Sequence, residues 1–261
     1  MTSIVDQSDL TGALPVVTTT CNFTRPADGT SCLLTWDNVI TMFHEFGHAL
    51  HGLLSEVRYP SRSGTAVPRD FVEFPSQVNE LWAWDETLIS RFAIHHATGE
   101  PLPSGLVARL RASRSAGEGH HTLELVAAML LDQAWHTTAL EELPTSVDEV
   151  ESFETAALER AGVAHALVPP RYRSCYFSHI FGSGYAAAYY GYLWAEVLDA
   201  DACAWFAENG GLCREAGEHF RRELLGRGGS IEPMQAWRHF RRAEPDVSHL
   251  LSRKGLPVEQ R

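Results

Sequence analysis

The sequence lacks the features that mark several classes of protein. No apolar run approaches the roughly 18 residues of a membrane-spanning helix, and residues 1–9 lack the basic segment and apolar core of a signal peptide. Basic residues are few, because 21 Lys and Arg stand against 33 Asp and Glu, for a formal net charge of −12. Nucleic acids and anionic membranes attract basic patches, so we expect neither as a partner.

Cysteine is also scarce. The five cysteines are odd in number and scattered, without C-x-x-C spacing. This pattern favours reduced thiols over a disulfide framework or a zinc ribbon, and therefore predicts a cytoplasmic protein. With 261 residues, 44% of them hydrophobic, the chain can bury a sizeable core as one large domain or two small ones. The sequence leaves the oligomeric state open.

One stretch carries a metal-binding pattern. His44-Glu45-Phe46-Gly47-His48 is an H-E-x-x-H sequence within an otherwise apolar segment, 39–54, which we predict to be a helix ending near residue 55. Residues four apart on a helix lie about 40° apart around the axis and about 6 Å along it, so His44 and His48 can bind one zinc ion. Glu45 is rotated by about 100° from His44 and is therefore predicted to act on the attacking water as a general base.

The apolar flanks of this helix favour a metal site over an amphipathic helix with solvent-facing histidines. Because Phe43, Phe46 and Leu50 surround the polar residues, we expect the helix to be largely buried, where two histidines and a glutamate need a metal or polar partners. His51 shares the histidine face but lies about 10 Å along the axis from His44. We interpret it as a residue of the cleft or a support for a ligand, with a core histidine as the alternative.

A catalytic zinc ion usually takes a third protein ligand. A histidine six residues after the second is absent, since a leucine stands there, whereas Glu73 lies 25 residues after His48 among apolar neighbours. We predict a second long helix from Asp70 to about residue 96, with Glu73 near its start as the third ligand. The alternative is that Glu73 only caps this helix. Gln77 and Glu80 share its face and are predicted to hydrogen-bond the ligands.

A second region rich in polar aromatic side chains lies near residues 169–192. Tyr185, Tyr189 and Tyr192 are spaced i, i+4, i+7, so they share one face if the segment is helical. A phenol or imidazole aimed at the scissile carbonyl stabilises the oxyanion of peptide hydrolysis, which makes these residues and His179 candidates for that role. The alternative is a tyrosine stripe that packs in the core.

The rest of the sequence predicts supporting structure. Residues 11–35 indicate one or two short strands and a turn. Residues 104–115 predict a helix with a solvated arginine face that includes Arg114, and 123–140 a strongly apolar core helix. The Gly-Glu-Gly-His-His stretch at 117–121 is predicted to be a mobile loop; a second metal site is the alternative.

Several longer stretches resemble the thimet oligopeptidase family of zinc metallopeptidases. They occur in the order found in that family: HEFGH at 44–48, SGT at 63–65, RDFVEFPSQ at 69–77, HIFGSGY at 179–185 and YYGY at 189–192. Together with CNFTRP at 21–26, their wording is most similar to the bacterial peptidyl-dipeptidase (dipeptidyl carboxypeptidase) branch. The resemblance covers essentially the whole chain. Because members of this family are longer, it implies that residues 1–261 are the C-terminal catalytic region, without the N-terminal helical region.

The resemblance implies a mainly α, zincin-type helical catalytic domain with a small β element near the active site. It implies one zinc ion, held by His44, His48 and Glu73, and Glu45 as the catalytic base. The residues implied to contact the substrate or stabilise the transition state are His179, Tyr185, Tyr189 and Tyr192, with Tyr192 as the main oxyanion donor.

The expected reaction is hydrolysis of short peptides with release of C-terminal dipeptides. Short peptides are the expected substrates because members of this family have a deep channel that excludes folded proteins. One alternative is an endo-acting oligopeptidase of the same family. The other is a truncated zinc-binding remnant without full activity.

Overall fold

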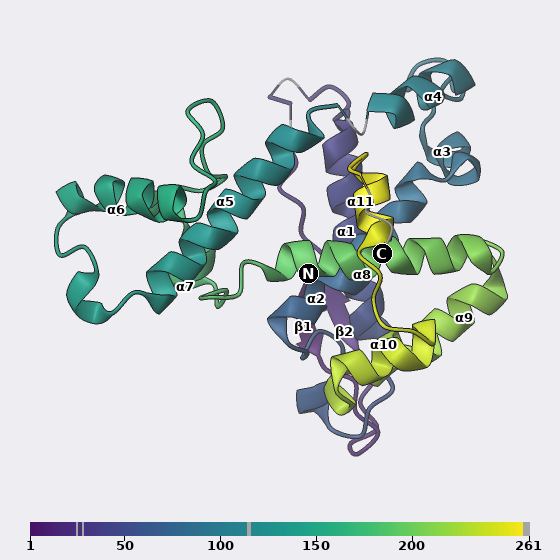
Figure 1. Ribbon diagram of the computed structural model, residues 1–261. Coiled ribbons are helices and arrows are strands. Elements are labelled where there is room, and N and C mark those ends of the chain that lie inside the picture. Colours follow the sequence, from purple (N-terminus) through teal and green to yellow (C-terminus); the bar gives the residue numbers. More distant parts are fainter. Residues whose placement is uncertain (25, 28, 114–115, 258–261) are drawn as a thin grey trace. The chain divides into compact units, whose positions relative to one another are not determined.

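The computed structural model describes residues 1–24, 26–27, 29–113 and 116–257 and is mainly helical, as predicted (Figure 1). The chain divides into two compact units. The first unit is Met1–Ser113 with Trp194–Arg261, and the second unit is Arg114–Leu193. None of the helices in the described ranges combines the length and the apolar character that crossing a bilayer requires.

The described elements are two short strands, α-helices of 5 to 20 residues and short 3-10 helices. Those of the first unit are β1 (Thr2–Val5), β2 (Val16–Thr18), α1 (Trp36–Leu53), η1 (Pro60–Arg62), α2 (Arg69–Glu80), η2 (Leu81–Trp84), α3 (Glu86–Phe92), α4 (Ser104–Ala112), α9 (Arg214–Glu223), η6 (Leu225–Ser230), α10 (Pro233–Arg241) and α11 (Ser248–Arg253). Those of the second unit are α5 (Glu118–Thr137), η4 (Leu140–Glu142), α6 (Val147–Arg160), η5 (Ser174–Tyr176) and α7 (Ser178–Gly182). The boundary between the units falls within α8 (Gly191–Glu208).

Helix α1, which carries the H-E-x-x-H sequence, begins with a capping box. The Thr35 hydroxyl accepts the Asn38 N–H at 3.2 Å, and the Asn38 side-chain oxygen accepts the Thr35 N–H at 3.3 Å. The prediction that this helix is largely buried is wrong. It buries one face, but Met42 is 41% exposed and Phe46 52% exposed, because the described elements that pack on α1 cover only part of its circumference.

The second predicted helix is shorter than expected. Instead of running to residue 96, α2 ends at Glu80 and is followed by η2 and then α3. The break is stabilised by Asp85, whose carboxylate accepts the Leu88 N–H at 3.0 Å and so starts a new helix. The residue that caps α2 is Pro68, without a side-chain hydrogen bond. The alternative in which Glu73 serves as a capping residue is therefore wrong.

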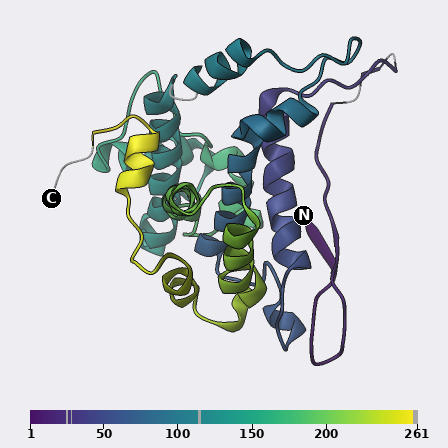
Figure 2. The same cartoon turned by 90° about the vertical axis from the view of Figure 1, so that its right-hand side faces the viewer.

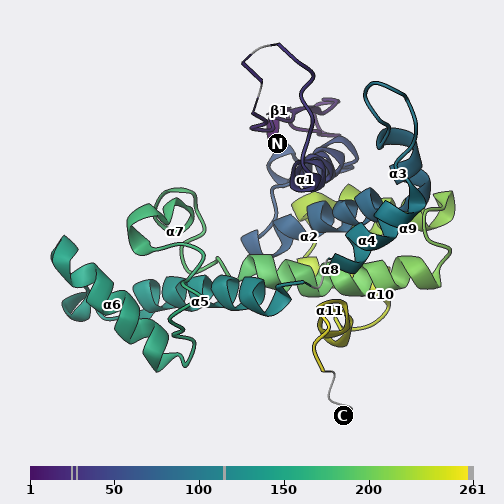
Figure 3. The same cartoon turned by 90° about the horizontal axis from the view of Figure 1, so that it is seen from above.

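The core of the first unit lies between α2, α8, α9 and α10. Its largest fully buried side chains include Phe74, Trp237 and Phe240. In Figure 3, α1 is seen nearly end-on, with α2 running across it. The antiparallel hairpin of β1 and β2 lies alongside α1 (Figure 2), where Val17 approaches the glycine at position 52. Strand β2 falls within the predicted β region, whereas β1 was not predicted.

The second unit is built around α5, the apolar helix expected from the sequence. The prediction of a mobile loop at 117–121 is wrong, because α5 begins at Glu118 and includes both histidines. Its first turn is supported by the Thr122 hydroxyl, which donates to the Glu118 carboxylate at 2.9 Å. The predicted helix at 104–115 is described as α4 up to Ala112, and its end at 114–115, with Arg114, lies outside the described residues.

Candidate active site

The site depends on an unusually close approach of α1 and α2. A Cβ atom at Gly47 would lie 2.6 Å from the Ser76 Cα and 2.9 Å from the Asn79 Cβ, so only glycine fits at this position. Asn79 also donates a hydrogen bond from its side-chain amide to the Phe43 carbonyl at 2.6 Å. Neither Gly47 nor Asn79 is among the site residues predicted from the sequence. A glycine inside a strongly helical pattern is the signal that would have revealed this contact.

The close approach brings three predicted ligands together. The Nε2 atoms of His44 and His48 each lie 3.2 Å from the same Glu73 carboxylate oxygen, Oε2. The three ligand atoms lie within 4.8 Å of one another, and within the described residues no other group of His, Cys, Asp and Glu meets this criterion. With zinc–ligand bonds of 2.0–2.1 Å, neighbouring ligands of a tetrahedral site are about 3.3 Å apart, so these separations fit a zinc ion.

The charges around His44 also fit a cation. Glu73 is only 5% exposed, and Glu80 contacts the other nitrogen of His44, with 2.7 Å between Oε1 and Nδ1. Burial lowers the pKa of His44, but the hydrogen bonds to Glu73 and Glu80 outweigh it and raise the pKa to about 9. A positive charge is therefore favoured beside these two carboxylates, and a divalent ion bound here would supply it in place of the proton. Glu80 holds the imidazole so that Nε2 faces Glu73.

Glu45 and His51 lie outside the ligand group. The Glu45 carboxylate forms an ion pair with the terminal amino group of Met1, and its side chain is 23% exposed. His51 is 1% exposed, and its Nδ1 has no hydrogen-bond partner among the described residues. Burial and the neighbouring His48 lower the pKa of His51 to about 3, so it is a neutral core histidine, the alternative considered from the sequence.

The predicted aromatic residues lie in the second unit, whereas the three predicted ligand residues lie in the first. His179 belongs to α7, and Tyr192 lies in the first turn of α8. Tyr185 and Tyr189 lie in the turns between these helices, so the segment is not one continuous helix, and the shared helical face that the i, i+4, i+7 spacing would give does not form. A helix is interrupted here because Gly184 has a φ of 79°.

The rings nevertheless form one cluster. Tyr185 stacks on Tyr192 with 5.3 Å between ring centroids, and Tyr189 meets Tyr192 at 5.1 Å. His179 lies 6.3 Å from Tyr185 and 6.4 Å from Tyr192. Burial raises the pKa of Tyr189, which keeps its hydroxyl protonated. The cluster therefore combines several phenols with one imidazole, although Tyr185 and Tyr189 are both largely buried.

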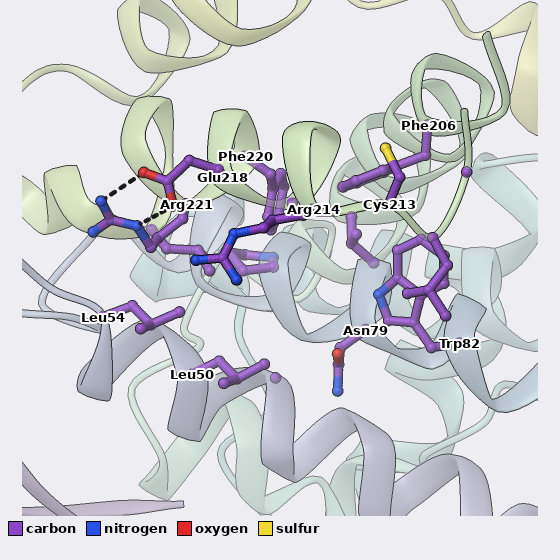
Figure 4. A pocket seen from close by; sticks show the side chains of 17 residues that line it. Leu50, Leu54, Asn79, Trp82, Phe206, Cys213, Arg214, Glu218, Phe220 and Arg221 are labelled. Carbon is purple, nitrogen blue, oxygen red and sulfur yellow. Dashed lines mark hydrogen bonds and ion pairs between the residues drawn. The ribbon is translucent and has the colours of Figure 1, made fainter. Parts of the chain in front are cut away.

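A separate pocket of about 330 Å³ lies in the first unit beside the same pair of helices (Figure 4). Leu50 and Leu54 of α1 face it from one side, and Phe206 and Phe220 contribute aromatic surface. His44, His48 and Glu73 are not among its lining residues. The pocket is thus a mainly apolar feature distinct from the histidine–glutamate group.

Comparisons with known proteins identify similar sequences. A family model described as Peptidase family M3 matches residues 1–256. The chain is 45% identical over 258 residues to the dipeptidyl carboxypeptidase of Escherichia coli (strain K12), covering 99% of this chain and 37% of that protein. It is 46% identical over 256 residues to the Salmonella typhimurium (strain LT2) dipeptidyl carboxypeptidase, covering 98% and 37%, respectively.

Oligopeptidase A of Escherichia coli (strain K12) is 40% identical over 244 residues, covering 93% of this chain and 35% of that protein. The chain thus spans little more than a third of the length of these relatives.

Proposed function

Because this chain belongs to peptidase family M3, we propose that it is a zinc-dependent metallopeptidase that hydrolyses peptide bonds in short peptides. The proposal assigns the family's catalytic region to residues 1–261, and His44, His48 and Glu73 to the metal. We also propose that the protein is cytoplasmic, as predicted from the cysteine pattern. The observation that carries it is the pair of 3.2 Å contacts from two histidine Nε2 atoms to one Glu73 oxygen, the spacing of a tetrahedral zinc site.

The residues proposed to act around the metal have separate tasks. When bound, zinc supplies a Lewis acid that polarises the scissile carbonyl and lowers the pKa of water. Glu45, next to a ligand but outside the ligand group, removes the proton from the attacking water and then donates it to the leaving amine. Tyr192, with Tyr185 and His179, donates hydrogen bonds to the carbonyl oxygen as it becomes negative. Tyr189 is proposed to contact the substrate.

The role of Glu45 is tested with Glu45→Gln, which keeps the shape of the side chain but removes the base. We expect bound zinc to stay at one ion per chain and kcat to fall by about 10²- to 10⁴-fold, the usual contribution of general-base catalysis. The assay is cleavage of a quenched fluorescent peptide, with zinc measured on the same samples. Asp37→Asn, on the exposed first turn of the same helix, is the matched control and should retain activity. A Glu45→Gln protein with near-normal kcat would remove Glu45 from the mechanism.

The dependence on metal is tested on the unchanged protein. Cleavage of the same peptide should stop when a chelator removes zinc and return when zinc is added back. Bound zinc without chelator-sensitive cleavage would instead support a zinc-binding chain that lacks activity.

We further propose that the products are C-terminal dipeptides, which is supported by the similarity to dipeptidyl carboxypeptidases. The similarity to oligopeptidase A supports the alternative of internal cleavage. The two are separated by product masses from a matched pair of peptides with free and amidated C-termini. Loss of cleavage on amidation, with products shorter by two residues from the free peptide, supports dipeptide release. Equal cleavage of both peptides at internal bonds supports the oligopeptidase.

A further inference from the structure

One buried carboxylate of the second unit does not belong to the proposed metal site. Asp132 lies in the apolar helix α5 and is 0% exposed. Its Oδ1 accepts the Ala187 N–H at 2.9 Å, and its Oδ2 accepts the Tyr189 N–H at 2.9 Å. The Nδ1 of His136 lies 2.8 Å from Oδ1. Burying a carboxylate is costly unless it is hydrogen-bonded, and here both oxygens have partners.

The segment that Asp132 holds has a strained backbone. Ala187 has a φ of 54°, a conformation that is unfavourable for an L-residue with a Cβ. It is the third residue of a four-residue turn that is closed by the Ala188 N–H donating to the Tyr185 carbonyl at 2.9 Å. Turns with positive φ at this position normally have glycine there. Contacts from outside the turn must therefore maintain its conformation.

Those contacts come from two successive residues of α5. Besides the bond from Asp132 to its N–H, Ala187 accepts a hydrogen bond at its carbonyl from the Gln133 side-chain amide at 2.9 Å. Both polar main-chain groups of the strained residue are thus held by side chains from α5. These side chains project from a helix of 20 residues, and a regular element of this kind is a suitable frame for positioning the turn.

The turn determines where two tyrosines of the proposed site point. Tyr185 is its first residue, and Tyr189, which follows it directly, donates its own N–H to Asp132. We infer that Asp132 is a positioning residue that holds the 185–189 segment in one strained conformation and thereby orients the Tyr185 and Tyr189 rings. The catalytic consequence rests on the proposed function, in which these rings act on the peptide substrate.

A control is needed to distinguish the positioning role of Asp132 from a general effect on the stability of the unit, and Glu154 provides one. This glutamate is also buried in the second unit, at 3% exposure. Its carboxylate accepts the Ser174 N–H and pairs with Arg173, so it anchors a segment that carries no proposed substrate residue. Glu154→Gln therefore controls for the general effect of neutralising a buried carboxylate in this unit.

The test is Asp132→Asn in the zinc-loaded chain. The substitution preserves size but places an amide donor opposite a main-chain N–H. We expect hydrogen exchange across 183–192 to accelerate by about tenfold or more, as when a hydrogen bond to a charged acceptor is lost. The kcat should fall by about tenfold and by more than KM rises, because oxyanion stabilisation develops only in the transition state. Bound zinc should stay unchanged, and Glu154→Gln should leave exchange in 183–192 as in the unchanged protein.

The exchange measurement tests the positioning role of Asp132, and the kinetics test the proposed action of the tyrosines on the substrate. Normal exchange across 183–192 in Asp132→Asn would overturn the positioning role, whatever the activity. Faster exchange with unchanged kcat and KM would support the anchor but refute the proposed action of Tyr185 and Tyr189 on the substrate. If Asp132→Asn does not fold, Gln133→Ala removes the other bond to Ala187 from a half-buried position, and the same two outcomes apply.

Discussion

The contact between α1 and α2 at Gly47 predicts that a single methyl group there weakens metal binding without altering any ligand. In Gly47→Ala, the new Cβ would lie 2.6 Å from the Ser76 Cα, whereas ordinary contacts begin at 3.4 Å. The helices must therefore separate by about 0.8 Å at this point to reach an ordinary contact distance. Zinc–ligand distances tolerate changes of only about 0.2 Å. His44 and His48 lie on one of these helices and Glu73 on the other. The distances from the two histidines to Glu73 should therefore increase.

Two quantities should change together in this variant. We expect the Kd for zinc to rise by roughly 10- to 100-fold, similar to the loss of a residue that orients a ligand. The free energy of unfolding of the metal-free protein should fall by about 1–3 kcal/mol, the usual cost of inserting a methyl group into a packed contact. Zinc affinity is measured by competition with a chelating dye, and unfolding by urea titration followed by circular dichroism.

Gly217→Ala is the matched control, because Gly217 is also helical and a Cβ there meets no atom within 4 Å. Alanine is favoured over glycine in a helix by about 1 kcal/mol, so this variant should be as stable or more stable, with unchanged zinc binding. A folded Gly47→Ala protein that binds zinc as tightly as the unchanged protein would refute the reasoning. It would mean that the distance between the helices does not control the ligand geometry.

Three further results are expected. Glu80→Gln should raise the zinc Kd by about 10-fold or more, because the carboxylate orients His44; the exposed Glu86→Gln is the control, and equal zinc affinity in both would exclude this role. His44→Ala should lower bound zinc toward zero after dialysis, and full retention would remove this histidine from the ligand set. Since burial lowers the folded-state pKa of His51 to about 3, the unfolded state binds a proton more readily below pH 6.5. The free energy of unfolding should therefore fall by up to about 1.4 kcal/mol per pH unit between 6.5 and 3. His51→Leu should show a weaker pH dependence in urea titrations at pH 7 and pH 5, and an equal dependence would contradict this assignment.

Much of the fold and of the candidate site can be predicted from local sequence patterns. The spacing of His44 and His48 indicates that both imidazoles leave one side of a helix, because the helical repeat relates residues four apart. The apolar neighbours of Glu73 indicate a helix that faces the core, and its carboxylate lies against both histidines. Apolar periodicity likewise identifies α1, α2 and α5 and the helical class.

The predictions of secondary structure are wrong where hydrogen bonds outweigh the conformation that the local sequence pattern favours. The second predicted helix breaks at Asp85, because its carboxylate hydrogen-bonds the main chain and offers an alternative to continued helix. The tyrosine spacing would place the three rings on one face of a helix, but Gly184 and Ala187 adopt positive φ, and Ala187 is held by residues more than 50 positions away. An aspartate and a glutamine inside the apolar helix 123–140 were the sequence signal for this contact.

The sequence alone thus determines the helical class, the main helices α1 and α5, and the residue types proposed to bind zinc and activate water, because these depend on neighbours within a few positions. Only the tertiary structure decides how closely α1 and α2 approach at Gly47, and which conformation the 185–189 segment adopts. Both depend on atoms brought together from distant parts of the chain, where packing and hydrogen bonding outweigh local propensity.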